Sequence, residues 1–250
     1  MKKFTKRIIE WLVKVKILTF PRSIVAKVIS YALFIQKGII VYYDSPEMDV
    51  KVFDLIRDVK ESTGMMLDYH EAYQLFMGVK MAEKTEGDLA EVGSYRGGSA
   101  KIICEAKGEK PLYVFDTFDE GLPKPSLVDD LSSYSFLEMY QEGMYATPFE
   151  NIKKILARYP NVHIYKGLFP NTAEPIKNKK FAFVNLDVDL YESTLNCLQF
   201  FYPKLNKGAV LISHDYTYIP GVRKAFDEFF EDKPGSVGKL FGSQCMIKKL

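Results

Sequence analysis

Short, continuously apolar runs alternate with stretches of helical periodicity through most of the chain. The runs predict buried strands, which end at Gly93 or span residues 112–116, 162–166, 181–187 and 209–215. The intervening stretches predict helices over residues 99–106, 148–158, 192–202 and 221–231. A terminal antiparallel pair is expected at residues 237–241 and 244–248. This order is typical of the α/β class, with a doubly wound, mostly parallel, seven-stranded sheet.

A further helical stretch precedes the first strand. Asp68 has the residue type and position of an N-cap, and Glu71 completes a capping box three residues later. We therefore expect a helix over residues 69–84, after a break in the helical pattern at residues 62–66. Gly208 is expected to form a turn just before the fifth strand.

The first 41 residues form a basic, amphipathic segment. Its apolar residues fall near helical spacing, interrupted at Pro21. No stretch reaches about 18 uncharged apolar residues, so we expect no membrane span, and no small-residue cleavage site indicates a secretory signal. Three interpretations stay open: a helix lying on an anionic membrane, a dimer or substrate-lid element, and a helix that covers the domain.

Charge is distributed unevenly along the chain. The net charge is +2, but residues 1–41 hold nine basic residues and one acidic residue, so the remainder carries −6. An acidic body argues against a nucleic-acid-binding protein. The three cysteines are far apart and lack metal-ligand spacing, so we expect reduced core thiols at Cys104, Cys197 and Cys245. Such thiols indicate a reducing compartment, and we expect a cytoplasmic protein.

A glycine loop joins the first strand to the next helix. Its pattern is G-x-x-x-G-G over residues 93–98, which differs from the G-x-G-x-x-G of dinucleotide binders. A strand-to-helix turn of this kind leaves backbone N–H groups free for a cofactor. Glu91 lies in the apolar strand before the loop. A buried acid needs a partner, either the amino group of a bound methionine moiety or a core Lys or Arg.

An acidic residue also ends the second strand. Asp116 follows Gly93 by 23 residues, a position where a carboxylate can accept the hydroxyl protons of a ribose. The same role occurs in NAD-binding folds, and an N-cap or a surface acid is the alternative. Residues 117–147 then form a long connection rich in Pro, Gly, Ser and aromatic residues. Connections of this length are usually lids or substrate loops.

A second group of polar residues follows strands four and five. Asp187 and Asp189 come after strand four, and His214 and Asp215 end strand five. Strand ends of a parallel sheet meet at one crevice, so these side chains are expected to lie together. Carboxylates suit Mg²⁺, which could hold vicinal hydroxyls while a neighbouring carboxylate takes a proton. The alternative is structural, with helix capping after Asp189. The other two histidines are expected to serve packing.

These motifs resemble those of the macrocin O-methyltransferase family. Residues 87–99 are similar to its S-adenosylmethionine (SAM) loop, and the stretches after strands two, three and four are also similar. The latter stretches are residues 115–123, 167–172, 186–194 and 202–205. The resemblance extends roughly from Ser62 to Phe230. It implies the class I methyltransferase fold (Rossmann-like), SAM, Mg²⁺, and activity on sugar hydroxyls of antibiotics.

The resemblance also implies roles for individual residues. Asp187 and Asp189 would be catalytic, one acid of this pair serving as ligand and general base, while Asp187, His214 and Asp215 would bind the metal. The SAM contacts would be Thr63, Glu91, Gly93, Ser94, Gly97, Gly98, Ser99, Asp116, Thr117 and Phe118. The family usually has two adjacent aspartates where this chain has His214 and Asp215. This departure puts the identity of the metal, and the need for one, in question.

Together these features predict a SAM-dependent O-methyltransferase that acts on a hydroxyl of a sugar or glycoconjugate. The alternatives are a metal-independent methyltransferase of a small molecule and a non-catalytic, SAM-binding, membrane-associated protein. We expect a methyltransferase domain over residues 61–250 after a basic helical extension over residues 1–60. The expected partners are a small-molecule or glycan acceptor, an anionic membrane at the inner face through residues 1–41, and a second copy of the chain, but no nucleic acid.

Overall fold

The computed structural model describes residues 50–129, 140–233 and 237–250. The chain divides into two compact units, Met1–Asp54 and Leu55–Leu250, and the β-sheet lies entirely in the second unit. The expectations for residues 1–41 lie outside the described residues. Within the described ranges, no helix has the length and apolar character to cross a membrane.

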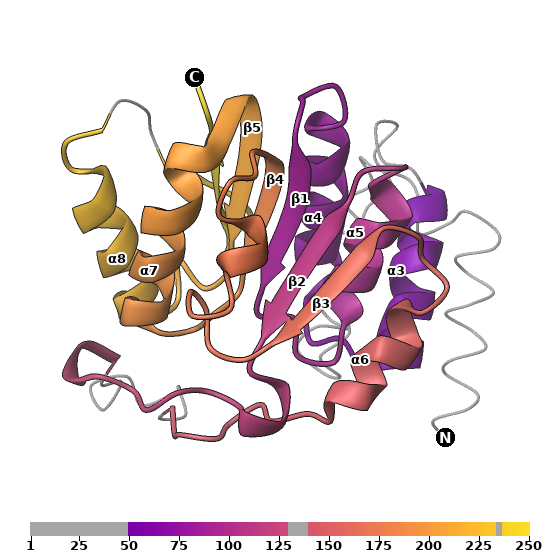
Figure 1. The fold of residues 1–250 in the computed structure, drawn as a ribbon, viewed down its shortest axis with the longest axis horizontal. Coiled ribbons are helices and arrows are strands. Elements are labelled where there is room, and N and C mark those ends of the chain that lie inside the picture. The colour runs from indigo at the N-terminus through magenta and orange to yellow at the C-terminus, as the bar shows by residue number, and fades with distance from the viewer. Residues whose placement is uncertain (1–49, 130–139, 234–236) are drawn as a thin grey trace, which may run out of the picture. The chain divides into compact units, whose positions relative to one another are not determined.

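The core of the second unit is a seven-stranded sheet in the order β3-β2-β1-β4-β5-β7-β6 (Figure 1). The pairs from β3 through β5 are parallel, and β7 runs antiparallel to both β5 and β6. The strands are β1 Asp88–Val92, β2 Leu112–Asp116, β3 Val162–Lys166, β4 Phe181–Leu186, β5 Leu205–Ser213, β6 Gly238–Lys239 and β7 Cys245–Lys248. The predicted doubly wound sheet and its antiparallel terminal pair are confirmed.

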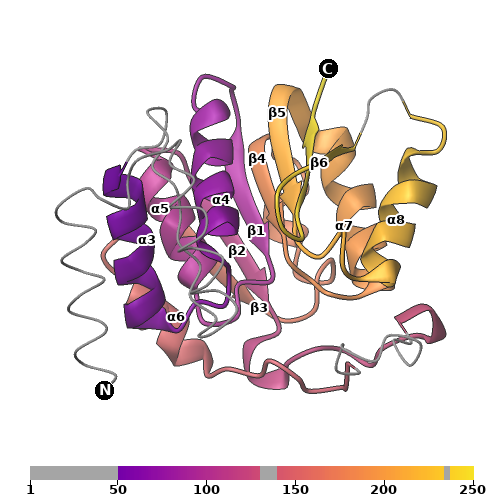
Figure 2. The same ribbon diagram turned by 180° about the vertical axis from the view of Figure 1, so that it is seen from behind.

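Helices cover both faces of this sheet. Figures 1 and 2 show α4 and α5 on one face and α7 and α8 on the other. The α-helices are α3 Val50–Thr63, α4 Tyr69–Met81, α5 Gly98–Ala106, α6 Phe149–Leu156, α7 Tyr191–Phe201 and α8 Pro220–Phe230. Short 3₁₀ turns occur at Phe118–Glu120, Leu127–Asp129, Glu174–Ile176 and Tyr202–Lys204. The predicted boundary between residues 60 and 61 falls inside α3, and the division into an extension and a methyltransferase domain stays a prediction.

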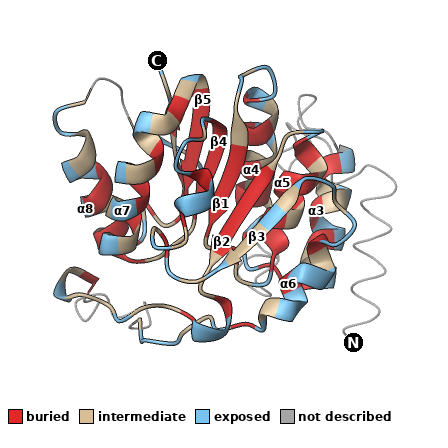
Figure 3. Cartoon of the chain, in the orientation of Figure 1, coloured by how far each residue is buried: buried red, intermediate tan, exposed pale blue. Residues whose placement is uncertain are grey.

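The apolar runs became strands because helices bury them on both sides. Every residue of β4 is buried, and so are the last four residues of β1 (Figure 3). The edge strand β3 is only partly covered, and its His163 is exposed and stacks on Tyr113. All three cysteines are buried and free, as expected for core thiols.

The largest differences between predicted and observed boundaries lie at the end of α4 and at the start of β5. The predicted N-cap of α4 is confirmed, since the Glu71 carboxylate accepts the Asp68 backbone N–H in a capping box. The helix, however, ends at Met81 rather than at residue 84. After Met81 the α-helical hydrogen bonds give way to i→i+3 bonds, in which the Glu83 N–H donates to the Lys80 carbonyl (3.2 Å) and the Thr85 N–H to that of Ala82 (3.0 Å).

Gly208 does not precede β5 but lies inside it. β5 begins at Leu205, and Gly208 has a φ of +85°. The register against β4 shifts at this point, because Phe181 pairs with Leu205 while Phe183 pairs with Val210. Extra residues on one strand form a bulge, which a glycine accommodates. The apolar run therefore revealed only the buried second half of the strand.

Candidate active site

The glycine loop after β1 brings two strand ends into contact. Gly93 has a φ of +82°, and a Cβ added there would lie 1.8 Å from the carbonyl oxygen of Asp187. The Gly93 N–H donates to the Phe115 carbonyl (2.8 Å), and the Asp187 N–H donates to that of Val92 (2.9 Å). Gly97, with a φ of +78°, is the N-cap of α5. The loop therefore lies at the point where the order of the sheet reverses, between β1 and β4.

A cavity of about 360 Å³ opens at this edge of the sheet. Ligand sites in proteins commonly have volumes of ~300–1,000 Å³, so the space suits a cofactor and part of an acceptor. Polar groups from the strand ends and apolar side chains from the connections line it. Among the lining residues are Met65, Met66, Glu71, Gly93, Ser94, Tyr95, Arg96, Gly98, Ser99, Asp116, Thr117, Leu122, Tyr140, Tyr145, Leu168, Asp187, Asp189, His214, Asp215, Tyr218 and Ser243.

Asp116 lines this cavity and binds the glycine loop. One carboxylate oxygen accepts the backbone N–H groups of Ser94 and Tyr95, both at 2.7 Å. The other accepts the Phe118 N–H at 2.8 Å. The acid therefore fixes the loop to the end of β2, a role that differs from the N-cap or surface acid considered beside ribose binding.

Glu91 is fully buried in β1, without a basic partner among the described residues. One carboxyl oxygen accepts a hydrogen bond from the Asn185 amide (3.0 Å), and within the described ranges the other has no partner. Burial raises the pKa of Glu91 to about 8, although Ser99 and Asn185 oppose this rise. The side chain is not among those that line the cavity.

The other predicted cofactor residues divide into two groups. Those at the cavity wall are Gly93, Ser94, Gly98, Ser99, Asp116 and Thr117. Gly97, Phe118 and Thr63 do not line it. The Thr63 hydroxyl donates to the Val59 carbonyl (2.8 Å) at the end of α3, and the neighbouring Met65 and Met66 reach the cavity instead.

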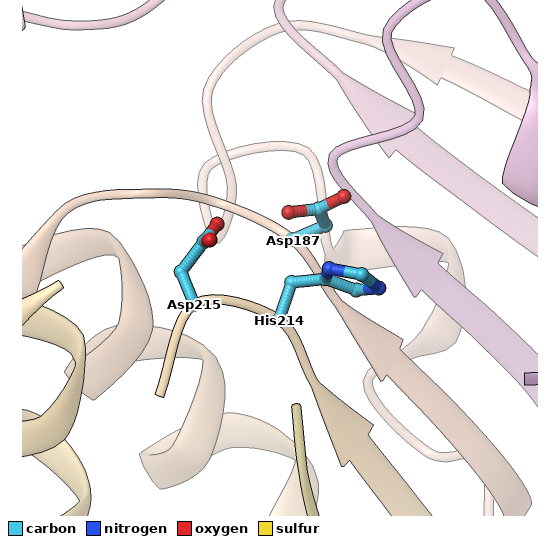
Figure 4. Close-up of side chains that lie close together, drawn as sticks. All are labelled: Asp187, His214 and Asp215. Atoms are coloured by element: carbon cyan, nitrogen blue, oxygen red, sulfur yellow. The ribbon is translucent and has the colours of Figure 1, made fainter. Parts of the chain in front are cut away.

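The acids after β4 and β5 meet as predicted. Ligand atoms of Asp187, His214 and Asp215 all lie within 4.8 Å of one another (Figure 4). Burial, followed by the charges of Glu71 and Asp116, raises the pKa of Asp187 to about 7. Burial and the charge of Asp187 raise the pKa of Asp215 to about 7 as well. Such a cluster favours either bound protons or a cation.

Asp189 lies beside this cluster and receives a hydrogen bond. The Tyr140 hydroxyl donates to its carboxylate at 3.0 Å. Burial, and then the charges of Asp215 and Asp187, raise the pKa of Asp189 well above its ordinary value. Asp189 and Asp215 both adopt a positive φ, +60° and +61°. Strained backbone of this kind is concentrated at functional sites.

Sequence reasoning missed several polar residues of the site. His214 contacts the side chains of Gln244 and Ser243, and Ser243 donates to the Glu71 carboxylate at 2.8 Å. The capping box singled out Glu71 only as a helix start. Tyr140 belongs to the long connection, where aromatic residues are plentiful and no pattern distinguishes one from another.

Comparisons with known proteins agree with this geometry. The 4'-O-methyltransferase of 8-demethyl-8-(2,3-dimethoxy-alpha-L-rhamnosyl)-tetracenomycin-C from Streptomyces olivaceus is 27% identical over 198 residues, or 76% of this chain and 75% of that protein. The structure of the O-methyltransferase NovP matches with a TM-score of 0.62 and 23% identity, over 74% of this chain and 81% of that one. The calicheamicin methyltransferase CalS11 matches with a TM-score of 0.63 and 18% identity, over 83% and 94%.

The fold of these two structures is the class I methyltransferase fold expected from the sequence. The family model for macrocin O-methyltransferases matches residues 70–234, which include the glycine loop and the acids after β4 and β5. The chain belongs to the macrocin O-methyltransferase family and is a SAM-dependent O-methyltransferase.

Proposed function

We propose that this enzyme methylates a hydroxyl of a sugar or glycoconjugate, with a divalent cation held by Asp187 and Asp215. The observation that carries the proposal is the gathering of Asp187, Asp189 and Asp215 in the cavity that the glycine loop borders. The Streptomyces olivaceus relative is described as a methyltransferase of a rhamnosyl group, which supports a sugar hydroxyl as the acceptor.

The cavity fits SAM in its polar groups as well as its size. The Ser94 hydroxyl is buried at the cavity wall, and the described residues offer it no hydrogen-bond partner. An unpartnered buried hydroxyl is costly, so a ligand that bonds to it would be stabilised. When bound, SAM supplies the methyl group of its sulfonium. The Ser94 hydroxyl and the N-terminal end of α5 would hold it, because the Ser94 and Tyr95 N–H groups already donate to Asp116.

The carboxylates of Asp187 and Asp215 fit a hard divalent cation. Both offer carboxylate oxygens as metal ligands. Because both side chains are buried close together, the charge of one makes ionisation of the other less favourable. A cation between them would offset that repulsion. When bound, Mg²⁺ lowers the pKa of a coordinated hydroxyl and leaves other coordination positions for water or substrate.

Asp189 is the residue best placed to take the proton of the acceptor hydroxyl. Asp189 lines the cavity beside the proposed cation ligands, and the Tyr140 hydroxyl holds its carboxylate in place at 3.0 Å. In the balanced reaction, the acceptor oxygen forms a bond to the methyl carbon as the sulfur–methyl bond breaks. The hydroxyl proton passes to Asp189, and S-adenosylhomocysteine leaves.

Apolar side chains around the cavity indicate the nature of the acceptor. Met66, Leu168 and Tyr218 line it and remain 66%, 40% and 58% exposed. Exposed apolar groups beside a polar site favour a ligand that carries an apolar body next to its hydroxyls. An amphipathic glycoconjugate meets both requirements.

The experiment is transfer of a labelled methyl group from SAM to glycan and lipid fractions and to a panel of apolar glycosides. We expect label in a methyl ether, formed with Mg²⁺ and lost with EDTA or in Asp187→Asn. Unchanged turnover in EDTA would instead favour the metal-independent alternative. Absence of transfer to every acceptor, with SAM bound, would favour the non-catalytic alternative.

A further inference from the structure

His214 follows the last residue of β5 and directly precedes Asp215, one of the two proposed cation ligands. Its side chain is buried, and both ring nitrogens have partners within hydrogen-bonding range. The position of the proton decides which of the two ring nitrogens has a lone pair, and hence whether the nitrogen that faces the acids could bind a cation. The surrounding hydrogen bonds determine the position of the proton. They can be followed from the Phe241 backbone, where the N–H can only donate and the carbonyl can only accept.

The orientation of the Gln74 amide is set by one backbone segment. The Phe241 N–H donates to its oxygen at 3.0 Å, and its nitrogen donates to the Phe241 carbonyl at 2.9 Å. In the reverse orientation the Gln74 oxygen would face the Phe241 carbonyl and its nitrogen would face the Phe241 N–H, so both hydrogen bonds would be lost. The Gln74 nitrogen must therefore be the donor in its contact with the Gln244 side chain, at 2.7 Å.

The orientation of the Gln244 amide follows from that of Gln74. Its oxygen accepts from Gln74, so its nitrogen faces the backbone carbonyl of Glu71 (3.3 Å) and His214 Nε2 (2.5 Å). An amide nitrogen has protons and no lone pair to share. His214 Nε2 must therefore be the acceptor, which means that it carries no proton.

The proton of the neutral ring then lies on Nδ1. An imidazolium would carry a proton on both nitrogens, so a ring whose Nε2 accepts from the Gln244 amide is neutral. Nδ1 lies 3.4 Å from the Ser243 hydroxyl oxygen, which in turn donates to the Glu71 carboxylate. Figure 4 shows one ring nitrogen on the side of Asp187 and the other directed away from it. Neither nitrogen retains a free lone pair.

We propose that His214 is a positioning residue rather than a metal ligand, and that Gln74 and Gln244 fix its tautomer. This inference rests on the proposed function, in which Asp187 and Asp215 hold the cation. His214 then connects the end of β5 to α4 and to the turn between β6 and β7. The same turn positions the next residue, because the Asp215 N–H lies 3.3 Å from the Ser243 hydroxyl.

The tautomer can be measured directly by ¹⁵N NMR of the full chain labelled at histidine. The chain has only three histidines, so His70→Gln and His163→Gln assign the His214 signals. We expect a protonated Nδ1 and an unprotonated Nε2. Gln244→Glu replaces the amide donor by an acceptor and should move the proton to Nε2. A wild-type ring protonated at Nε2, or no change in Gln244→Glu, would overturn the proposal.

Metal binding gives an independent test that requires no turnover. Mn²⁺ titration should give dissociation constants within about threefold for wild type and His214→Asn, while Asp215→Asn weakens binding at least tenfold. A tenfold loss in His214→Asn would overturn the proposal. If wild type binds no Mn²⁺ while Nδ1 is protonated, the positioning role is supported, and the metal part of the proposed function fails.

Discussion

Asp189 receives its hydrogen bond from Tyr140, which lies 49 positions away in the chain. The acids after β4 could be predicted because strand ends of a parallel sheet share one edge. Tyr140 could not, because its place depends on the path of a long connection that has no periodicity. The same holds for the Ser243 contact with Glu71, which joins positions 172 residues apart.

The contact between Tyr140 and Asp189 predicts a defect in the chemical step. Tyr140→Phe removes a hydrogen bond to a carboxylate, an interaction of about 1.5–3 kcal/mol. We expect kcat to fall ~10- to 100-fold with SAM affinity unchanged, measured by initial rates and calorimetry. Tyr159→Phe is the matched control, since Tyr159 donates to Glu105 outside the cavity. Equal rates for both variants would refute the role given to Tyr140.

Glu91 predicts how stability changes with pH. Its pKa of about 8 in the folded protein exceeds its ordinary value of 4.5, so the folded state binds a proton that the unfolded state has released. The free energy of unfolding should therefore fall by up to about 1.4 kcal/mol per pH unit between 4.5 and 8. Glu91→Gln, which cannot ionise here, should lose the Glu91 contribution to this slope in denaturant unfolding of the SAM-free enzyme, whereas Asp187 and Asp215, whose pKa values are also raised, keep theirs. Parallel pH profiles for both proteins would disprove this account.

At the scale of elements, the apolar runs predicted the strands well because helices bury the sheet on both faces. Their ends were less predictable. From the local sequence, Gly208 looked like the boundary of a strand. The bulge that accommodates it arises from the register between β4 and β5, and this register depends on a partner strand elsewhere in the chain. Gly93, in contrast, was identified from its local pattern, and the structure gives the reason in the nearby Asp187 carbonyl.

Gly93→Ala tests this contact between two elements. A Cβ there would meet backbone that cannot move without displacing β4. We expect the free energy of unfolding to fall by about 3 kcal/mol or more, with loss of SAM binding. Gly108→Ala provides the control, because Gly108 also has a positive φ (+58°) but no atom within 4 Å of the added Cβ. It should cost only about 1 kcal/mol of strain. Similar losses in both variants would contradict the steric explanation.

At the scale of the whole molecule, fold and cofactor could be predicted, whereas the acceptor could not. The apolar part of the cavity combines Met66, Leu122, Tyr145, Leu168 and Tyr218, of which Leu122 and Tyr145 share one connection and the others come from three more. Only the folded arrangement places them together, and no spacing in the sequence relates them. That the acids meet could be predicted because they follow strands, whose order in the sheet determines where they lie.

The most direct test of the central claim is single-turnover transfer of labelled methyl from bound SAM to an accepted glycoside, with wild type and Asp189→Asn. The account predicts that wild type with Mg²⁺ forms a methyl ether, and that Asp189→Asn binds SAM normally but transfers at least about 100-fold more slowly. Transfer by Asp189→Asn at the wild-type rate would contradict the assignment of Asp189 as the general base.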